Sequence, residues 1–239
     1  MDDVSQPPTA FRPDVTDTVT DADLTAVAPA PSRRARRELP KQVTAVRLQI
    51  VAIQVMSGLR GWLGASSNGV IVVSSVVDGL GSEPITFQGK PYLGIKDGDL
   101  LPLGPANDPS AVFTVYYREG QLPRTLAFSL LVIRSNQGLR DIGGAISGAM
   151  ADDRYKELSD IVTTAVTGAV PVYGTLLQVA QESIGLIAAY LKAKPDDQLG
   201  YYQVNYTNRF DNLGVGRHPA NARTFAVDKI MLAYQLDAS

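Results

Sequence analysis

Two aspartates that flank a glycine are the side chains of this chain best suited to bind a metal ion. Asp97 and Asp99 end the segment Lys90-Pro-Tyr-Leu-Gly-Ile-Lys-Asp-Gly-Asp99, and Asp108 follows. Carboxylate oxygens are the hard ligands that calcium prefers. Asp-Gly-Asp is equally ordinary turn chemistry, and the full ligand spacing of a dedicated calcium loop is missing. Calcium at Asp97 and Asp99 is therefore one hypothesis, and a structural turn is the other.

Four arginines form the strongest local charge in the sequence. Arg33, Arg34, Arg36 and Arg37 could bind an acidic protein surface, a membrane headgroup or nucleic acid. The alternative is a solvated linker. No aromatic residue alternates with these arginines, and the formal net charge of −2 gives no overall attraction to nucleic acid. We therefore expect a protein partner or a homo-oligomer, with a membrane surface as the alternative and nucleic acid disfavoured.

Other reactive residue types are scarce. The chain has no cysteine and one histidine, His218. Thiolate metal sites, disulfides, cysteine nucleophiles and histidine clusters are therefore excluded. A lone histidine in a glycine-rich segment is more often structural or solvent-facing than catalytic. We expect a protein without catalytic residues and, calcium apart, without a cofactor.

The composition divides the chain near residue 42. The first 31 residues contain six aspartates and five prolines, and the arginine cluster follows. Such a segment buries too little apolar surface to offset the entropy of ordering it. Residues 1–42 are predicted to be an extended arm that is disordered by itself, and residues 43–239 to be one domain. The N-terminus has no ordinary signal peptide, which favours a cytoplasmic protein or a component of a larger assembly.

The domain is predicted to be mainly β. Residues 43–55 alternate with a period of two, with Val46, Leu48, Ile50 and Ala52 on one face. Glycine turns indicate two hairpins, one around Gln88-Gly89-Lys90 and one around Glu119-Gly120-Gln121. The other predicted strands are residues 69–77, 84–87, 91–95, 111–117, 124–134, 201–207 and 225–236. About eight strands suffice for an antiparallel two-sheet sandwich.

An apolar helical hairpin is predicted as an insertion at about residues 139–194. Asp152 or Asp153 should begin one helix, which Pro171 ends. Thr175, with Gln178 in the capping-box position, should begin the other, and Pro195 should stop it. The second helix carries an apolar stripe of Leu177, Ala180, Ile184, Ile187 and Leu191. The stripe is explained by packing on a sheet or on another subunit, and a membrane-inserting hairpin is the alternative.

The first long strand at Val43, the segment Lys90 to Asp99 and the strands around Val112 and Leu126 together resemble C2-type β-sandwich domains. The resemblance covers roughly residues 43–134. It implies binding of calcium and phospholipid through aspartates on loops at one end of the sandwich, and Asp97 and Asp99 are the matching positions. Tyr117-Arg118-Glu119-Gly120 stands where the family has a second acidic pair.

The function expected from these features is non-enzymatic. The leading hypothesis is a structural or interaction protein whose sandwich is a scaffold and which joins an assembly through its arm and helical hairpin. The alternatives are a peripheral C2-like module that binds calcium or phospholipid, and a membrane-inserting protein that uses the apolar hairpin.

Overall fold

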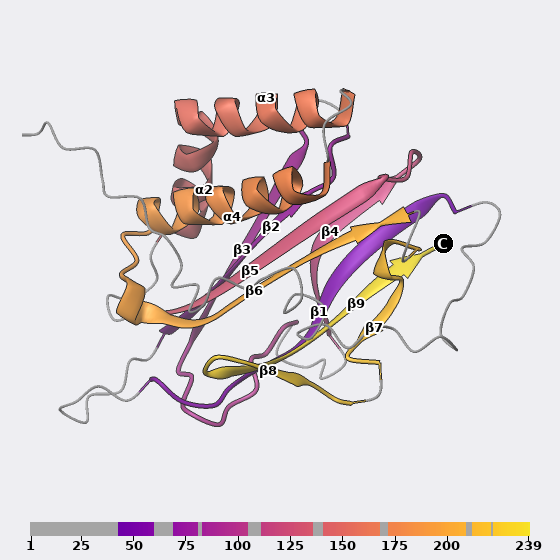
Figure 1. Ribbon diagram of the computed structural model, residues 1–239. Helices are drawn as coiled ribbons and strands as arrows, with labels where there is room; N and C mark the ends of the chain where they lie inside the picture. The colour runs from indigo at the N-terminus through magenta and orange to yellow at the C-terminus, as the bar shows by residue number, and fades with distance from the viewer. Residues whose placement is uncertain are drawn as a thin grey trace, which may run out of the picture.

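The protein folds into three layers, in which a group of helices covers one of two stacked sheets (Figure 1). The computed structural model describes residues 43–59, 69–80, 83–104, 111–135, 141–167, 172–208, 212–220 and 222–239. The central sheet has the strand order β3-β2-β5-β6, and the outer sheet has the order β4-β1-β9-β7, with β8 also paired to β9. All the strand pairs are antiparallel. The predicted mainly β sandwich with a helical insertion is confirmed.

The strands of the central sheet are β2 (Gly69–Val77), β3 (Ile85–Leu93), β5 (Thr125–Ser135) and β6 (Gln198–Thr207). Those of the outer sheet are β1 (Ala45–Val55), β4 (Phe113–Glu119), β7 (Gly216–His218), β8 (Phe225–Val227) and β9 (Ile230–Ala238). The α-helices of the described residues are α2 (Ile142–Ala151), α3 (Asp153–Thr167) and α4 (Val172–Tyr190).

The central sheet is buried on both faces. Every residue of β2 is buried, and so is every residue of β5 except Arg134. Val70, Val72 and Val76 face the outer sheet, whereas Ile71 and Val73 face the helices. A strand covered on both faces needs apolar side chains at nearly every position, which explains the continuous apolar sequences of β2 and β5.

The outer sheet is built around β1, whose inward face changes phase in the middle of the strand. Val46, Leu48 and Ile50 point into the sandwich core, as predicted, but the next inward residue is Ile53 and not Ala52. The pairing of β1 with β9 shifts between Ile50 and Ala52, so one extra residue is inserted there. Such a bulge moves the following side chains to the opposite face.

The predicted hairpin at Gln88-Gly89-Lys90 is wrong, because β3 runs without interruption through these residues. Gly89 is paired with Val73 in the middle of the strand. A Cβ atom on Gly89 would clash with Cγ2 of Ile142 in α2. The glycine therefore allows a helix to approach the sheet closely. In the sequence, a glycine with this role cannot be distinguished from a glycine in a turn.

The other predicted hairpin is also wrong, although its two strands exist. Strand β4 pairs with β1 in the outer sheet, whereas β5 pairs with β2 and β6 in the central sheet. The segment around Gly120 (φ 84°) therefore crosses between the sheets. The predicted strand 225–236 is itself a hairpin of β8 and β9, which turns at Asp228, a residue with positive φ.

In the described part of the helical insertion, three α-helices form where two were predicted. Asp141 is the N-cap of α2 and accepts a hydrogen bond from the amide of Gly144. Asp152 accepts one from the amide of Arg154 at the start of α3, so its predicted capping role is confirmed. Helix α4 begins before Thr175, and Gln178 instead donates to Glu182. Pro171 lies outside the described residues.

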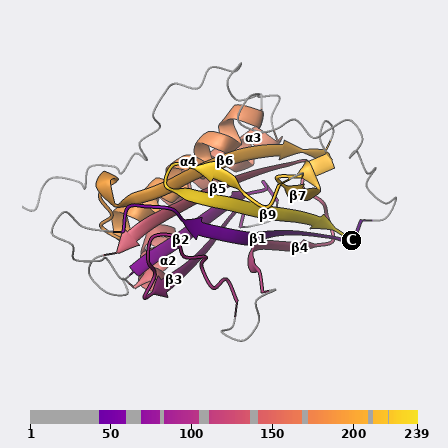
Figure 2. The same cartoon turned by 90° about the horizontal axis from the view of Figure 1, so that it is seen from below.

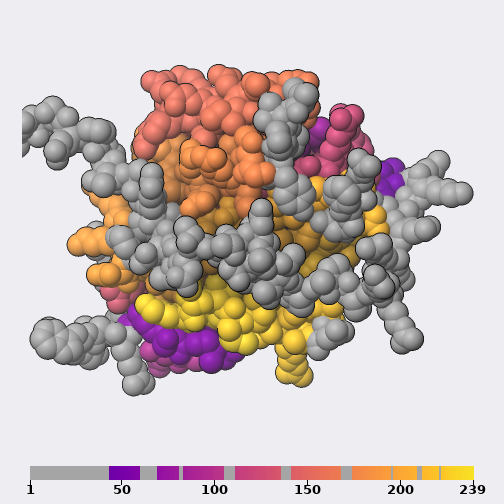
Figure 3. Space-filling view, in the orientation of Figure 1, coloured from indigo at the N-terminus to yellow at the C-terminus, as the bar shows by residue number. Residues whose placement is uncertain are grey.

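The end of α4 also differs from the prediction. Lys192 adopts positive φ, and the amide of Ala193 donates to the carbonyl of Ala188. This left-handed termination ends the helix before Pro195. Leu176 replaces Leu177 on the buried stripe, whose other predicted members all face the central sheet. The space-filling view shows the helices as one layer above the strands (Figure 3). No helix among the described residues is long and apolar enough to cross a membrane.

Two isoleucines in the helical layer give a matched test of this packing. Ile184→Ala in α4 removes a fully buried side chain and should cost about 2–5 kcal/mol of unfolding free energy. Ile161→Ala in α3, where the side chain is 44% exposed, should change it by less than about 1 kcal/mol. Chemical denaturation of the full chain measures both. Equal losses would contradict the three-layer packing.

Candidate interaction surface

The Asp97-Gly98-Asp99 loop joins the central sheet to the outer sheet. Asp97 Oδ1 accepts a hydrogen bond from the amide of Leu59 at 3.0 Å, and Asp99 Oδ2 accepts one from the amide of Lys96 at 2.8 Å. The structure therefore brings both predicted calcium ligands into one loop, where each already has a structural role. Among the described residues, no three acidic or histidine side chains are grouped around a common metal position. Asp108 lies outside the described residues.

The same loop extends the outer sheet beside the end of β1. The amide of Val55 donates to the carbonyl of Asp99, the amide of Gly98 donates to the carbonyl of Val55, and the amide of Leu101 donates to the carbonyl of Ile53. Residues 98–101 thus continue along the edge of β1 where β4 no longer pairs with it. This places Leu100 directly beside Gln54, on the opposite side from Met231.

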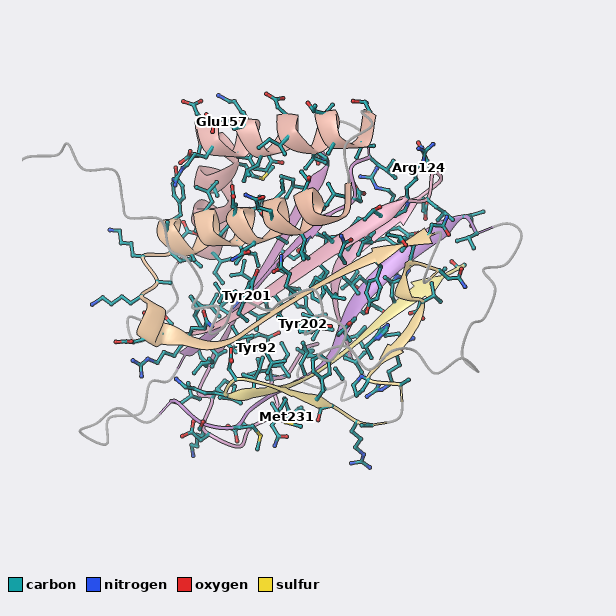
Figure 4. The ribbon with its side chains drawn as sticks, viewed as in Figure 1. Tyr92, Arg124, Glu157, Tyr201, Tyr202 and Met231 are labelled. Atoms are coloured by element: carbon teal, nitrogen blue, oxygen red, sulfur yellow. The ribbon has the colours of Figure 1, made fainter. Side chains whose placement is uncertain are left out.

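Three apolar side chains lie around Gln54 on the outer face at this end. Leu100 is 62% exposed, and Met56, which directly follows the last residue of β1, is 49% exposed. Met231 is partly buried and lies on the outer sheet, away from the helices (Figure 4). Met56, Leu100 and Met231 are called the Met56 patch below. The view from below shows the outer sheet facing the reader, with the described helices behind it (Figure 2).

The opposite end of the outer face is polar. Arg47 on β1 has Tyr117 of β4 on one side and Asp237 of β9 on the other. The Arg47 guanidinium lies over the Tyr117 ring, 5.1 Å from its centroid. The Tyr117 hydroxyl donates to Glu119, and both side chains are exposed. The outer face therefore combines an apolar end with a charged end.

A buried polar cluster joins the two sheets at Asp78, directly after β2. Its Oδ2 accepts from Arg118 Nε at 2.7 Å and from the Tyr116 hydroxyl at 2.7 Å, and its Oδ1 accepts from the amide of Leu80. Burial raises the pKa of the Asp78 carboxyl, and the hydrogen bonds and Arg118 partly oppose this. Because all three strong interactions are internal, the cluster reads as a structural link between β2 and β4.

His218 belongs to an aromatic cluster within the sandwich. Its ring stacks on Tyr234 at 4.8 Å between centroids, and its Nε2 donates to the carbonyl of Gly214 at 2.7 Å. Burial lowers the pKa of His218. The Tyr234 hydroxyl is hydrogen-bonded to those of Tyr202 and Tyr206, at 2.8 and 2.6 Å. Tyr202 points into this core from β6 (Figure 4). The predicted structural role of His218 agrees with this packing.

Serine side chains provide polar contacts beneath the helices. The hydroxyls of Ser75 in β2 and Ser183 in α4 are 2.6 Å apart, and Ser183 also donates to the carbonyl of Ala180. Ser129 lies opposite Ser75 on β5. Tyr201 lies in the same layer, and burial raises its pKa to about 12. The Ser75–Ser183 contact joins β2 directly to α4 and favours one position of the helix on the sheet.

Removing the arginine of the Asp78 cluster should be strongly destabilising. Arg118→Met leaves a buried carboxylate without its countercharge and should cost about 3–5 kcal/mol at pH 7. Because the pKa of Asp78 is raised in the native state, the native state binds the proton more tightly than the unfolded state does. The contribution of Asp78 to the unfolding free energy therefore falls as pH rises above 3.8, the ordinary pKa of the carboxyl group. The variant should therefore lose less at pH 4 than at pH 7 in urea denaturation. Arg154→Met, at an exposed ion pair, is the control and should cost at most about 1 kcal/mol.

The tyrosine hydroxyls offer a second matched comparison. Tyr234→Phe removes the hydroxyl that joins Tyr202 and Tyr206, and should cost about 1–3 kcal/mol because buried partners lose a hydrogen bond. Tyr117→Phe removes an exposed hydroxyl and should leave the unfolding free energy unchanged within error. Thermal and urea denaturation measure both. A Tyr234→Phe protein as stable as Tyr117→Phe would refute the structural role of the hydroxyl network.

The predicted site residues have different outcomes. Asp97 and Asp99 lie together in one loop. Arg33, Arg34, Arg36 and Arg37 lie outside the described residues, as does the whole arm 1–42. The sequence reasoning missed the Met56 patch and the Asp78 cluster, because their members are far apart in the chain. Strand pairing brings the residues of the patch together, and the stacking of the two sheets brings Asp78 to Tyr116 and Arg118. No protein-family model and no curated protein sequence matches this chain.

Proposed function

We propose that this chain is a non-enzymatic interaction protein that presents the outer face of its outer sheet to a protein partner. The observation that carries the proposal is the unequal covering of the two sheets. The central sheet is buried between the helices and the outer sheet, whereas Met56 and Leu100 are exposed at the end of β1 in the outer sheet. Large apolar side chains gathered on one exposed face are typical of protein-binding surfaces.

The internal use of the helices supports this choice of surface. The apolar stripe of α4, with Ile184, Ile187 and Leu191, is buried against the central sheet. Covering the central sheet therefore accounts for the apolar stripe of the helices. Insertion of the hairpin into a membrane would expose this part of the core. The partner-binding role of the arm, through Arg33, Arg34, Arg36 and Arg37, stays part of the proposal because the arm leads directly into β1.

A peripheral membrane module is the second candidate function. Lys96 and Lys229 are exposed beside the Met56 patch, and the amide of Met56 donates to the carbonyl of Lys229. Apolar side chains flanked by lysines are suited to a membrane interface with anionic lipids. The calcium hypothesis at Asp97 and Asp99 belongs to this candidate, since each carboxylate has a second oxygen available for an ion.

A peptide-display library selected on the full chain tests the leading proposal. Selected peptides should carry apolar anchors and should bind Met56→Gln/Leu100→Gln at least about tenfold more weakly, because apolar anchors dominate such contacts. The control is Ile161→Gln, which replaces a similarly exposed side chain on the helical layer and should keep full affinity. Both variants should retain wild-type stability within about 0.5 kcal/mol.

Two results would refute this proposal. The first is that no peptide is selected, and the second is equal binding to the patch variant and the Ile161→Gln control. Flotation with phosphatidylserine vesicles decides the second candidate. If flotation requires calcium and is lost in Asp97→Asn/Asp99→Asn, the binding partner is a membrane and the leading proposal is wrong. If the protein does not float either with or without calcium, the peripheral membrane function is excluded.

A further inference from the structure

Methionine is the only sulfur-containing residue type in this chain. The sequence has four methionines and no cysteine, so no thiolate competes with the thioethers for a peroxide. Met1 lies outside the described residues. Of the other three, Met56 and Met150 are 49% and 40% exposed, whereas Met231 is partly buried. Because oxidation follows exposure, Met56 and Met150 are the described side chains most open to it.

The outer sheet holds the backbone of Met56 in place. Its amide donates to the carbonyl of Lys229 at 2.8 Å, directly beyond the pairing of Val55 with Ile230. Val55 and Ile230 belong to the sandwich core, whereas Met56 does not. A chemical change at the Met56 sulfur therefore alters the surface of the outer sheet and leaves the core in place.

Oxidation of a thioether by hydrogen peroxide is a two-electron reaction. A sulfur lone pair attacks one peroxide oxygen, so the S–O bond forms as the O–O bond breaks. The hydroxide that leaves takes up the proton of the transferred oxygen and becomes water. A thiol-dependent reductase returns the sulfoxide to the thioether, oxidising two thiols to a disulfide and releasing water. Oxidation thus converts a flexible apolar side chain reversibly into a polar one.

We infer that Met56 is a reversible oxidation site, and that its sulfoxide form lowers the affinity of the Met56 patch for apolar partners. This inference rests on the proposed function, because it names a regulation of that same surface. Leu100, the most exposed member of the patch, has no oxidisable atom, so the sensitivity resides in Met56. A sulfoxide oxygen buried under an apolar anchor loses its hydrogen bonds to water, which weakens binding.

Peptide mass mapping of the full chain tests the chemistry. In dilute hydrogen peroxide, Met56 and Met150 should each gain one oxygen atom at rates within about threefold of each other, because they are similarly exposed. Both should react before Met231. A thiol-dependent methionine sulfoxide reductase should remove the oxygen from Met56. If Met56 stays unoxidised while Met150 is fully converted, the inference is wrong, whatever the peptides do.

Peptide affinity before and after peroxide tests the regulation. A peptide selected on the untreated chain should bind the oxidised wild type at least about fivefold more weakly, and reductase treatment should restore binding. In Met56→Leu, the affinities before and after peroxide should agree within about twofold, because leucine has no sulfur. The matched control is Met150→Leu on the helical layer, which should show the same loss as the wild type.

The outcomes separate this inference from the proposed function. Equal affinities of the untreated and the oxidised wild type would overturn the inference and leave the function intact, since the peptide still binds the patch. A loss that persists in Met56→Leu would also overturn it, because another methionine would then be responsible. If no peptide is selected, the proposed function fails and the regulation fails with it.

Discussion

The structure depends on removing both faces of the central sheet from water. Strands β2 and β5 carry apolar side chains in both directions, so neither face can be left exposed without a large hydrophobic cost. The outer sheet covers one face, and α4, supported by α2 and α3, covers the other. The helices inserted between β5 and β6 are therefore a required layer of the fold.

Polar groups inside these layers determine how the layers align. Burying a hydroxyl or a carboxylate is costly unless it finds partners, and the partners here come from neighbouring layers. Ser75 meets Ser183 across the interface of sheet and helix, Asp78 meets Arg118 and Tyr116 between the sheets, and the tyrosine hydroxyls join β6 to β9. Slipping a strand by one residue would separate such pairs, so they favour a single arrangement.

The same layering decides which surfaces are free to bind a partner. The apolar stripe of α4, from which an assembly contact or membrane insertion was predicted, is buried within the domain. The outer sheet has core on one side only, and its other side carries both the Met56 patch and the Arg47–Tyr117 end. An interaction protein built in this way would present a sheet face, while its helices serve the fold.

The sequence by itself determined the fold class, most strand positions, the helical insertion and the capping role of Asp152, because periodicity and capping are local properties. It could not tell that Gly89 sits within a strand and Gly120 in a crossover, since both look like hairpin turns until the positions of Ile142 and β1 are known. The phase change at Ala52 depends on pairing with β9. The Met56 patch and the Asp78 cluster join residues distant in the chain, so only strand pairing, for the patch, and the stacking of the two sheets, for the cluster, could place them together.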